Sequence, residues 1–148
     1  MDTLQLFRLA QTLPRLKPRF RGVFACDTLP DRVRRFPSAF VCNTDPIDRK
    51  GSHWVAYWFK NPEECEFYDS FGRKPEEYDN RLRDFVDRNA LICLYNDVQV
   101  QPDSVDTCGL HALFYLYCRA KNIPMTEVIR QTSETLVRDV VWKGNRLP

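Results

Sequence analysis

The spacing of apolar residues changes along this chain, and it predicts short helices and strands in alternation. Residues 3–13 carry apolar side chains at helical intervals and are followed by Pro14, which favours a short helix. Residues 39–43, 53–59 and 65–71 are rich in aromatic and β-branched residues, and such residues favour strands. In residues 53–59, Trp54, Ala56 and Trp58 alternate with Val55, Tyr57 and Phe59, which predicts a strand with apolar side chains on both sides. The proline-containing stretch between the first helix and residue 38 is expected to be mostly loop.

The last two of these strands are expected to form a hairpin because only a short proline-containing connection separates them. If residue 57 pairs with residue 65, then residue 53 pairs with residue 69. Any neighbouring register still leaves His53 and Asp69 at the same end of the hairpin.

The most apolar segment begins at Cys108. Apolar residues at positions 110, 113, 114 and 117 follow helical spacing, and the other faces are largely apolar too. A helix that is apolar on all sides has to be enclosed by other elements. We therefore expect a central, buried helix whose first turn holds Cys108.

Three further segments complete the pattern. Residues 76–89 are expected to be helical, residues 91–100 strand-like, and residues 126–142 an amphipathic helical stretch.

The chain has 148 residues, of which 43% are hydrophobic and 28% charged, and no internal repeat or linker divides it. These values are typical of one globular domain, so we expect a single domain over residues 1–148.

Composition also bears on location and partners. No apolar run approaches the ~20 residues of a membrane helix, and the N-terminus lacks the layout of a secretory signal. We expect an intracellular, non-secreted monomer whose six cysteines are free thiols.

The net charge is +2, and basic residues gather near the N-terminus. These residues either contact DNA or an acidic partner weakly, or they form an ordinary solvated face. This basic cluster comprises Arg15, Lys17, Arg19 and Arg21.

Cys108 has a setting that suits a nucleophile. It follows the capping candidates Asp106 and Thr107, and the positive end of a helix favours a thiolate. His53 is one of only two histidines, and it is the candidate base that would take the thiol proton. A buried packing cysteine and an exposed strand-edge histidine are the simpler interpretations.

Two further residues supply the remaining roles of such a site. Asp69, expected near His53, could fix the tautomer of the imidazole. Gln101 lies on the loop that enters the helix, and its amide, together with the Cys108 backbone N–H, could stabilise an oxyanion. Taken singly, a turn aspartate and a solvated loop glutamine would be ordinary.

Three segments together resemble the adenain family of cysteine proteases, from adenoviruses, other large DNA viruses and virus-like mobile elements. They are "VCNTDPIDRKGSHWVAYWF", "EFYDSFG" and "VQPDSVDTCGLHALFYL". The resemblance spans about residues 20–120, and the same clan contains the SUMO and other ubiquitin-like proteases. It implies an α+β fold in which a mixed central sheet is packed between helices, with the nucleophile at the N-terminus of the buried central helix.

The resemblance also implies a function. His53 would be the base, Asp69 its partner, Cys108 the nucleophile and Gln101 the oxyanion donor. Trp54 and Gly109 would bind substrate beside the scissile bond. The implied activity is cleavage of viral precursor proteins at glycine-containing sites during virion maturation, in the host nucleus or cytoplasm or in the virion, with no cofactor needed for the chemistry.

Several alternatives stay open. Adenovirus enzymes have Glu where this chain has Asp69, whereas Asp is usual in the ubiquitin-like branch, so an isopeptidase acting on ubiquitin-like tails is one alternative. The chain stops well short of the adenovirus enzyme's C-terminus, which leaves activation by a peptide or DNA open, and no role is carried over to Cys93. A zinc-stabilised module using Cys108, His111 and Cys118 and an inactive protein-binding module are the other interpretations.

Overall fold

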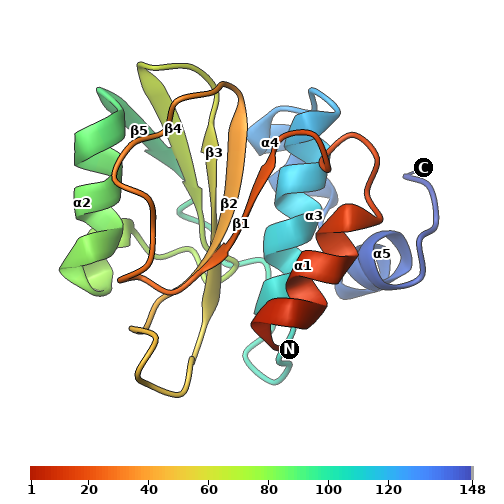
Figure 1. Ribbon diagram of the computed structural model, residues 1–148. Helices are drawn as coiled ribbons and strands as arrows, with labels where there is room; N and C mark the ends of the chain where they lie inside the picture. The colour runs from red at the N-terminus through yellow and green to blue at the C-terminus, as the bar shows by residue number, and fades with distance from the viewer. Residues whose placement is uncertain (148) are drawn as a thin grey trace.

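Five strands form one mixed sheet in the computed structural model, which describes residues 1–147 (Figure 1). The strands are β1 (Phe20–Phe24), β2 (Ser38–Asn43), β3 (Trp54–Phe59), β4 (Glu64–Tyr68) and β5 (Ile92–Tyr95). They lie in the sheet in chain order. The central pairs β2·β3 and β3·β4 are antiparallel, and the outer pairs β1·β2 and β4·β5 are parallel.

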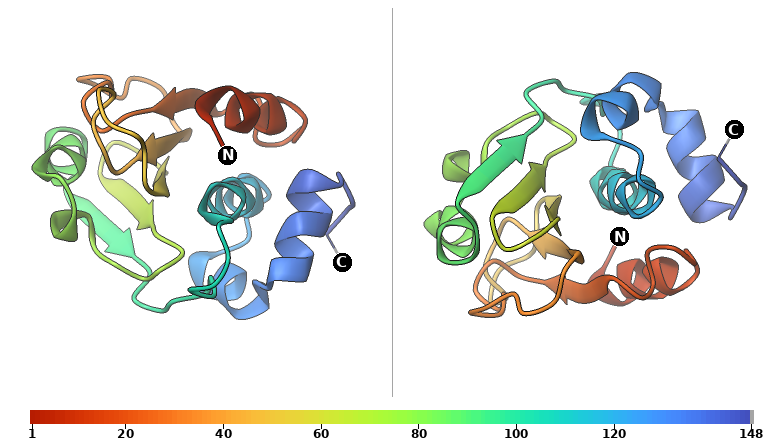
Figure 2. Two further views of the ribbon diagram at one scale, coloured as in Figure 1. Left: turned by 90° about the horizontal axis from the view of Figure 1, so that it is seen from below. Right: turned by 90° about the horizontal axis from the view of Figure 1, so that it is seen from above.

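Helices cover both faces of this sheet. One face carries α2, and the other carries α1, α3 and the C-terminal helices, so the views in Figure 2 show three layers. The fold is thus α+β, with a mixed sheet packed between helices, as expected. The helices are α1 (Thr3–Gln11), α2 (Asn80–Asn89), α3 (Cys108–Ala120), α4 (Met125–Gln131) and α5 (Glu134–Val137), with a 3₁₀ turn at Pro75–Glu77 and a π-helical turn at Arg138–Trp142.

Alternation along the strands divides the apolar residues between two cores. On β3, Ala56 and Trp58 face the core around α3, whereas Tyr57 and Phe59 face the core under α2. Successive side chains of a strand point to opposite faces, so a continuous apolar strand supplies both cores at once. The expected two-sided pattern of residues 53–59 is therefore confirmed.

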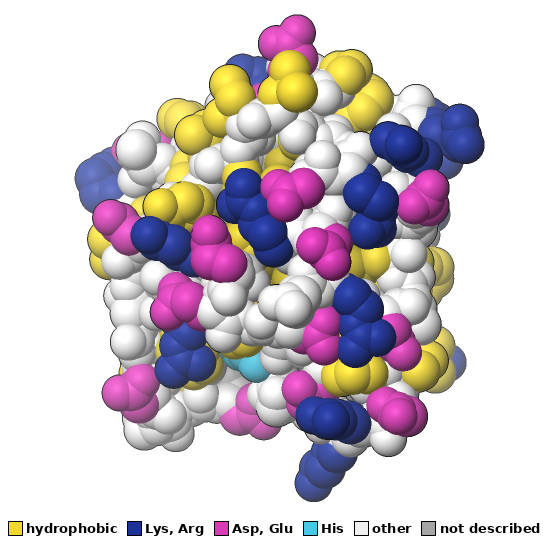
Figure 3. All heavy atoms as spheres, turned by 90° about the vertical axis from the view of Figure 1, so that its left-hand side faces the viewer, with side chains coloured by type: hydrophobic (Ala, Val, Ile, Leu, Met, Phe, Trp, Pro, Cys, Tyr) yellow, Lys and Arg dark blue, Asp and Glu magenta, His cyan; other side chains and the backbone are white. Residues whose placement is uncertain are grey.

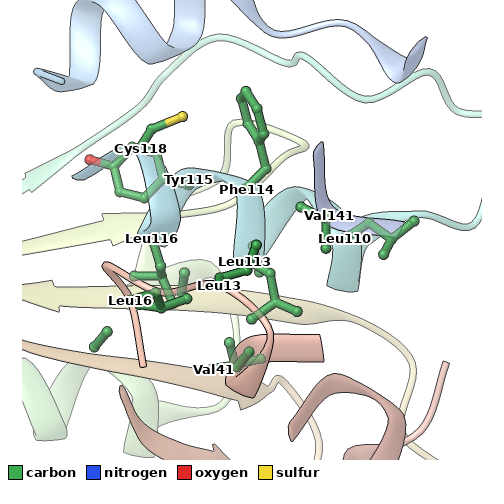
Figure 4. Packing of buried hydrophobic residues seen from close by; sticks show 14 of the residues in the cluster. Leu13, Leu16, Val41, Leu110, Leu113, Phe114, Tyr115, Leu116, Cys118 and Val141 are labelled. Carbon is green, nitrogen blue, oxygen red and sulfur yellow. The ribbon is translucent and has the colours of Figure 1, made fainter. Parts of the chain in front are cut away.

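Helix α3 is the centre of the larger core. Its residues from Cys108 to Leu116 are all buried, and Figure 2 shows the helix enclosed by the sheet, α1 and the C-terminal segment. Figure 4 shows Leu113 and Leu116 on the side of α3 that faces Val41 of the sheet and Leu16. The prediction of a buried central helix is confirmed.

Several predicted helix boundaries need correction. The first helix ends at Gln11, two residues earlier than expected. Residues 76–89 are interrupted because Tyr78 is extended and Asp79 caps a new helix by accepting the Arg81 N–H. Residues 126–142 likewise divide at Ser133, which caps α5.

The strand predictions also need correction. The hairpin pairs Phe59 with Cys65, a register two residues away from the expected one, because Asn61 accepts the backbone N–H groups of residues 63 and 64 and closes a tight turn. The stretch 91–100 is a strand only to Tyr95. Strand β1 was not predicted, since its short mixed sequence becomes a strand by pairing with β2.

No helix among residues 1–147 is long and apolar enough to cross a membrane.

A buried ion pair joins α3 to the sheet. The Arg119 guanidinium donates to both carboxylate oxygens of Glu66, at 2.7 and 2.9 Å, and the Tyr115 hydroxyl donates to the same carboxylate. Only 3% of the Glu66 side chain is exposed. A buried carboxylate persists only when such partners replace water.

Replacing Arg119 with alanine should therefore lower the free energy of unfolding by roughly 3–5 kcal/mol, because it leaves the Glu66 carboxylate buried without its counter-charge. Arg130, which pairs with Glu127 on the surface, is the matched control. Arg130→Ala should cost no more than ~1 kcal/mol. Chemical denaturation of both variants tests this, and equal losses would contradict the structural role given to the buried pair.

Candidate active site

The four sequence-predicted catalytic residues lie where strand and helix ends meet at one edge of the sheet. His53 directly precedes β3, and Asp69 directly follows the antiparallel strand β4. Cys108 opens α3, and Gln101 belongs to the loop between β5 and α3. All four side chains are buried.

His53 and Asp69 form a direct contact. The His53 Nε2 atom lies 2.6 Å from Oδ1 of Asp69, and the ring of Phe71 stacks on the imidazole with centroids 4.9 Å apart. Burial opposes protonation of His53, but hydrogen bonds to Asp69 and to the Cys108 side chain outweigh it and raise the pKa of His53 to about 9. The imidazole is thus fixed in orientation and favours its protonated form.

Asp69 is held as a carboxylate by several donors. Burial alone would raise the pKa of Asp69, yet hydrogen bonds from His53 and Tyr78 and from the Phe71 backbone lower it overall. The Phe71 N–H donates to Oδ1 at 2.9 Å, and the Tyr78 hydroxyl donates to Oδ2. Tyr78 was not singled out from the sequence, because only the break before α2 brings its hydroxyl to this carboxylate.

Asn96 fixes the backbone of Asp69. Its side-chain oxygen accepts the Asp69 N–H at 3.0 Å, and its amide nitrogen donates to the Asp69 carbonyl at 2.5 Å. Strand β5 ends at Tyr95, directly before this residue. Asn96, like Tyr78, has no sequence motif that would have identified it.

The thiol of Cys108 continues the same chain of contacts. Nε2 of His53 faces Asp69, which leaves Nδ1 as the ring nitrogen open to the Cys108 side chain. The Trp54 backbone N–H also points to Sγ, at 3.5 Å. Thiol, imidazole and carboxylate therefore stand in sequence, the arrangement in which a base takes a proton from a nucleophile while an acid orients the base.

Gln101 is fixed at both ends of its amide. The Ser70 hydroxyl donates to Oε1 at 2.6 Å, and Nε2 donates to the Val105 carbonyl at 2.8 Å. An amide nitrogen carries two hydrogens, so one N–H of Gln101 is left for another acceptor. The hydrogen bonds of Gln101 thus connect it with Ser70, the neighbour of Asp69, rather than with Cys108.

Trp54 and Gly109 lie side by side next to the nucleophile. A Cβ atom added to Gly109 would come within 3.3 Å of the Trp54 indole and 2.8 Å of a Leu6 methyl group. The Trp54 indole N–H donates to the Met1 carbonyl at 3.1 Å, and Trp54 borders a cavity of about 320 Å³. Gly109 is therefore needed for close packing at this point, and Trp54 faces open space.

A second cavity, of about 510 Å³, shares Asp45, Pro46 and Arg49 with the first. It is bordered on its own side by His53, Phe71 and Tyr78. Figure 3 shows histidine atoms in a hollow between acidic and basic side chains on the face that carries α2. The imidazole of the candidate base is thus reached from solvent through a polar opening.

The cysteines and the basic cluster were also singled out from the sequence. All six cysteines are free, and no three His, Cys, Asp or Glu side chains among residues 1–147 are arranged to hold a metal ion. In the basic cluster, Arg21 is half-buried and donates to Ser38 Oγ at 2.7 Å, so it serves to anchor β1. Arg15, Lys17 and Arg19 are exposed.

No model of a protein family and no curated protein sequence matches this chain. Among solved structures, the pS273R protease of ASFV is similar, with a TM-score of 0.48 and 22% identity over 74% of this chain; the chain spans 45% of that structure's length. The central domain of the uncharacterized Lpg1148 protein from Legionella pneumophila is similar, with a TM-score of 0.44 and 14% identity, covering 82% of this chain and 76% of that one. These likenesses are too distant to assign an activity.

The raised pKa of His53 makes a prediction about stability. A group whose pKa is higher in the folded state stabilises the fold below its unfolded pKa, ~6.5 for histidine, and that contribution is lost as the pH rises through the folded value. The free energy of unfolding should thus fall as the pH is raised from ~6.5 to about 9. Chemical denaturation across this range measures it, and His53→Gln should show a smaller decline. An NMR titration that placed the His53 pKa near 6.5 would contradict the expectation.

Proposed function

We propose that this protein is a cysteine endopeptidase. The observation that carries the proposal is the 2.6 Å contact between His53 Nε2 and Asp69 Oδ1, together with the Cys108 thiol next to His53 in space, where the Trp54 backbone N–H points to Sγ at 3.5 Å. Nucleophilic catalysis by a thiol requires a base within reach and a group that orients the base, and all three are present in that order. The position of Cys108 at the start of a thirteen-residue helix adds the positive helix end.

In the proposed first half-reaction, His53 begins as the imidazolium that carries the Cys108 thiol proton, and the thiolate sulfur forms a bond to the carbonyl carbon of the peptide. The carbonyl electrons move to oxygen, giving a tetrahedral oxyanion. The C–N bond then breaks as the electrons return, and His53 gives its proton to the leaving amine. Asp69 holds the imidazole through Nε2 and stabilises its charge while it carries the proton.

The second half-reaction releases the acyl group. Water gives a proton to His53 and adds to the thioester carbon, and the carbon–sulfur bond breaks to return the thiolate beside the protonated His53. The oxyanion in both halves would be stabilised by the Cys108 backbone N–H and the remaining amide N–H of Gln101. Its Ser70 and Val105 contacts support this role, because they fix which end of the amide is the donor.

For the substrate, we propose a chain with glycine next to the scissile bond, as in viral precursor proteins cleaved during virion maturation. Trp54 and Gly109 support this, since the indole stands 3.3 Å from the position of a Gly109 Cβ atom. An aromatic side chain packed this close to the first turn of the nucleophile helix leaves little width for a branched substrate residue. The family resemblance of residues 53–54 and 108–109 favours the same substrate class.

The proposal is tested with activity probes that end in a glycine-derived electrophile, some carrying capsid-precursor peptides and others ubiquitin-like modifiers. The peptide probes should label the parent protein at Cys108 and leave Cys108→Ala unlabelled. Cys93→Ala is the matched control, because Cys93 is the thiol outside the site that is partly exposed, and it should label as the parent does. Preferential labelling by the ubiquitin-like probes would favour the isopeptidase alternative, and labelling of Cys108→Ala would contradict the assignment of the nucleophile.

Gln101→Ala tests the oxyanion role. Losing one such donor typically lowers kcat by about 10² to 10³ with little change in KM, because the bond forms mainly in the transition state. Alkylation of Cys108 by iodoacetamide builds no oxyanion and should proceed at nearly the parental rate. Ser104→Ala, on the same loop but exposed, is the control and should keep parental kcat.

Since Gln101 is buried, melting curves must accompany the kinetics. A Gln101→Ala variant that melts as the parent does and hydrolyses peptide within about twofold of it would exclude the oxyanion role. Parallel loss of alkylation and hydrolysis would show general damage to the site instead.

A further inference from the structure

A carboxylate outside the proposed catalytic residues contacts the start of the nucleophile helix. Glu134, the first residue of α5, accepts hydrogen bonds from the Thr107 hydroxyl at 2.9 and 3.0 Å through its two oxygens. It also contacts Nε2 of His111, one turn into α3. The proposed mechanism gives none of these three residues a role.

Thr107 is the N-cap residue of α3 but does not cap it. An N-cap threonine normally accepts an N–H of the first turn with its side-chain oxygen and has an extended backbone. Thr107 makes no such bond, and its backbone lies at φ −122° and ψ 19°. Ser133, at the start of α5, shows the usual arrangement in the same chain, with ψ 158° and a hydroxyl that accepts the Leu136 N–H at 3.1 Å.

The two N-caps differ in what holds the hydroxyl. The Ser133 hydroxyl is exposed and turns to its own helix, whereas the Thr107 hydroxyl is buried and directed at Glu134. His111 secures the carboxylate from the other side, and its remaining nitrogen, Nδ1, is buried without a hydrogen-bond partner among the described residues. An uncapped helix start costs stability, so it persists where other contacts impose it.

We propose that Glu134 is a positioning residue that keeps the N-cap oxygen of Thr107 away from the first turn of α3. An N-cap side chain accepts the N–H of the second or third helical residue, here Gly109 or Leu110. With the Thr107 oxygen held away, these two N–H groups stay free of an internal acceptor and, together with the Cys108 N–H, remain available to the substrate oxyanion. This inference rests on the proposed protease function, because an oxyanion gives the uncapped N–H groups their use.

A double-mutant cycle separates this role from a purely structural one, in which Glu134 only holds α5 against α3. In Glu134→Ala the Thr107 hydroxyl is released, turns to its own helix and occupies a first-turn N–H, so kcat should fall at least about tenfold with little change in KM. Thr107→Val has nearly the same shape but no oxygen to cap the helix, and it should keep kcat within about threefold of the parent. The double variant should recover to that level, because it too lacks the capping oxygen.

Loss of the His111 contact is common to Glu134→Ala and to the double variant, so it cancels in the comparison between them. A purely structural role of Glu134 predicts a different result: kcat of the double variant would be as low as that of Glu134→Ala or lower. That result, or parental kcat in Glu134→Ala, would overturn the proposal. If Glu134→Ala does not fold, Glu134→Gln with and without Thr107→Val is compared in the same way, since its single amide oxygen can serve only one of the two former donors fully.

A measurement that does not depend on catalysis tests the role of Glu134 separately from the proposed protease function. Amide hydrogen exchange at Gly109 and Leu110 should be slower in Glu134→Ala than in the double variant, because a capped N–H is protected. If even the parent cleaves no peptide, the proposed function fails while the exchange difference still tests the positioning role. Equal exchange in the two variants would reject that role even in an active protease.

Discussion

The burial of α3 is the constraint on which the rest of this structure depends. The helix is apolar on nearly every face, so it has to be surrounded, and β2, β3, α1 and the C-terminal segment all supply parts of its enclosure. Once α3 is fixed on the sheet, its first residue lies at the edge where β3 begins and β4 ends. The position of Cys108 beside His53 thus follows from packing that was driven by apolar area.

Two carboxylates on or just after β4 are buried, and each is stabilised by partners that replace water. The two have different roles. Glu66, within the strand, receives Arg119 and Tyr115 from α3 and so ties the central helix to the sheet. Asp69, just beyond the strand, receives His53 and Tyr78 and remains charged next to the thiol. In each case the partners replace water around a buried charge, and a missing partner would leave it uncompensated.

Supporting hydrogen bonds hold the parts of the candidate site in place at this edge of the sheet. Asn96 fixes the backbone of Asp69, Ser70 fixes the amide of Gln101, and Glu134 holds the Thr107 hydroxyl next to Cys108. A nucleophile, a base and an oxyanion donor have to be held within a fraction of an ångström to be effective, and such supporting contacts provide that rigidity. The proposed peptidase therefore draws on residues from four separate parts of the chain.

Elements with a strong local pattern could be predicted from the amino-acid sequence: the buried helix from Cys108, the two-sided strand 53–59, and the grouping of His53 and Asp69 at one end of a hairpin, which held although the register differed by two residues. Contacts made on folding were needed to establish the strand at Phe20–Phe24, the break at Tyr78, and the roles open to Asn96 and Glu134. Periodicity reports which residues turn toward a core, because burial imposes it along each element. Contacts between polar residues far apart in the chain leave no such periodic trace, since they depend on which elements meet when the apolar faces are covered.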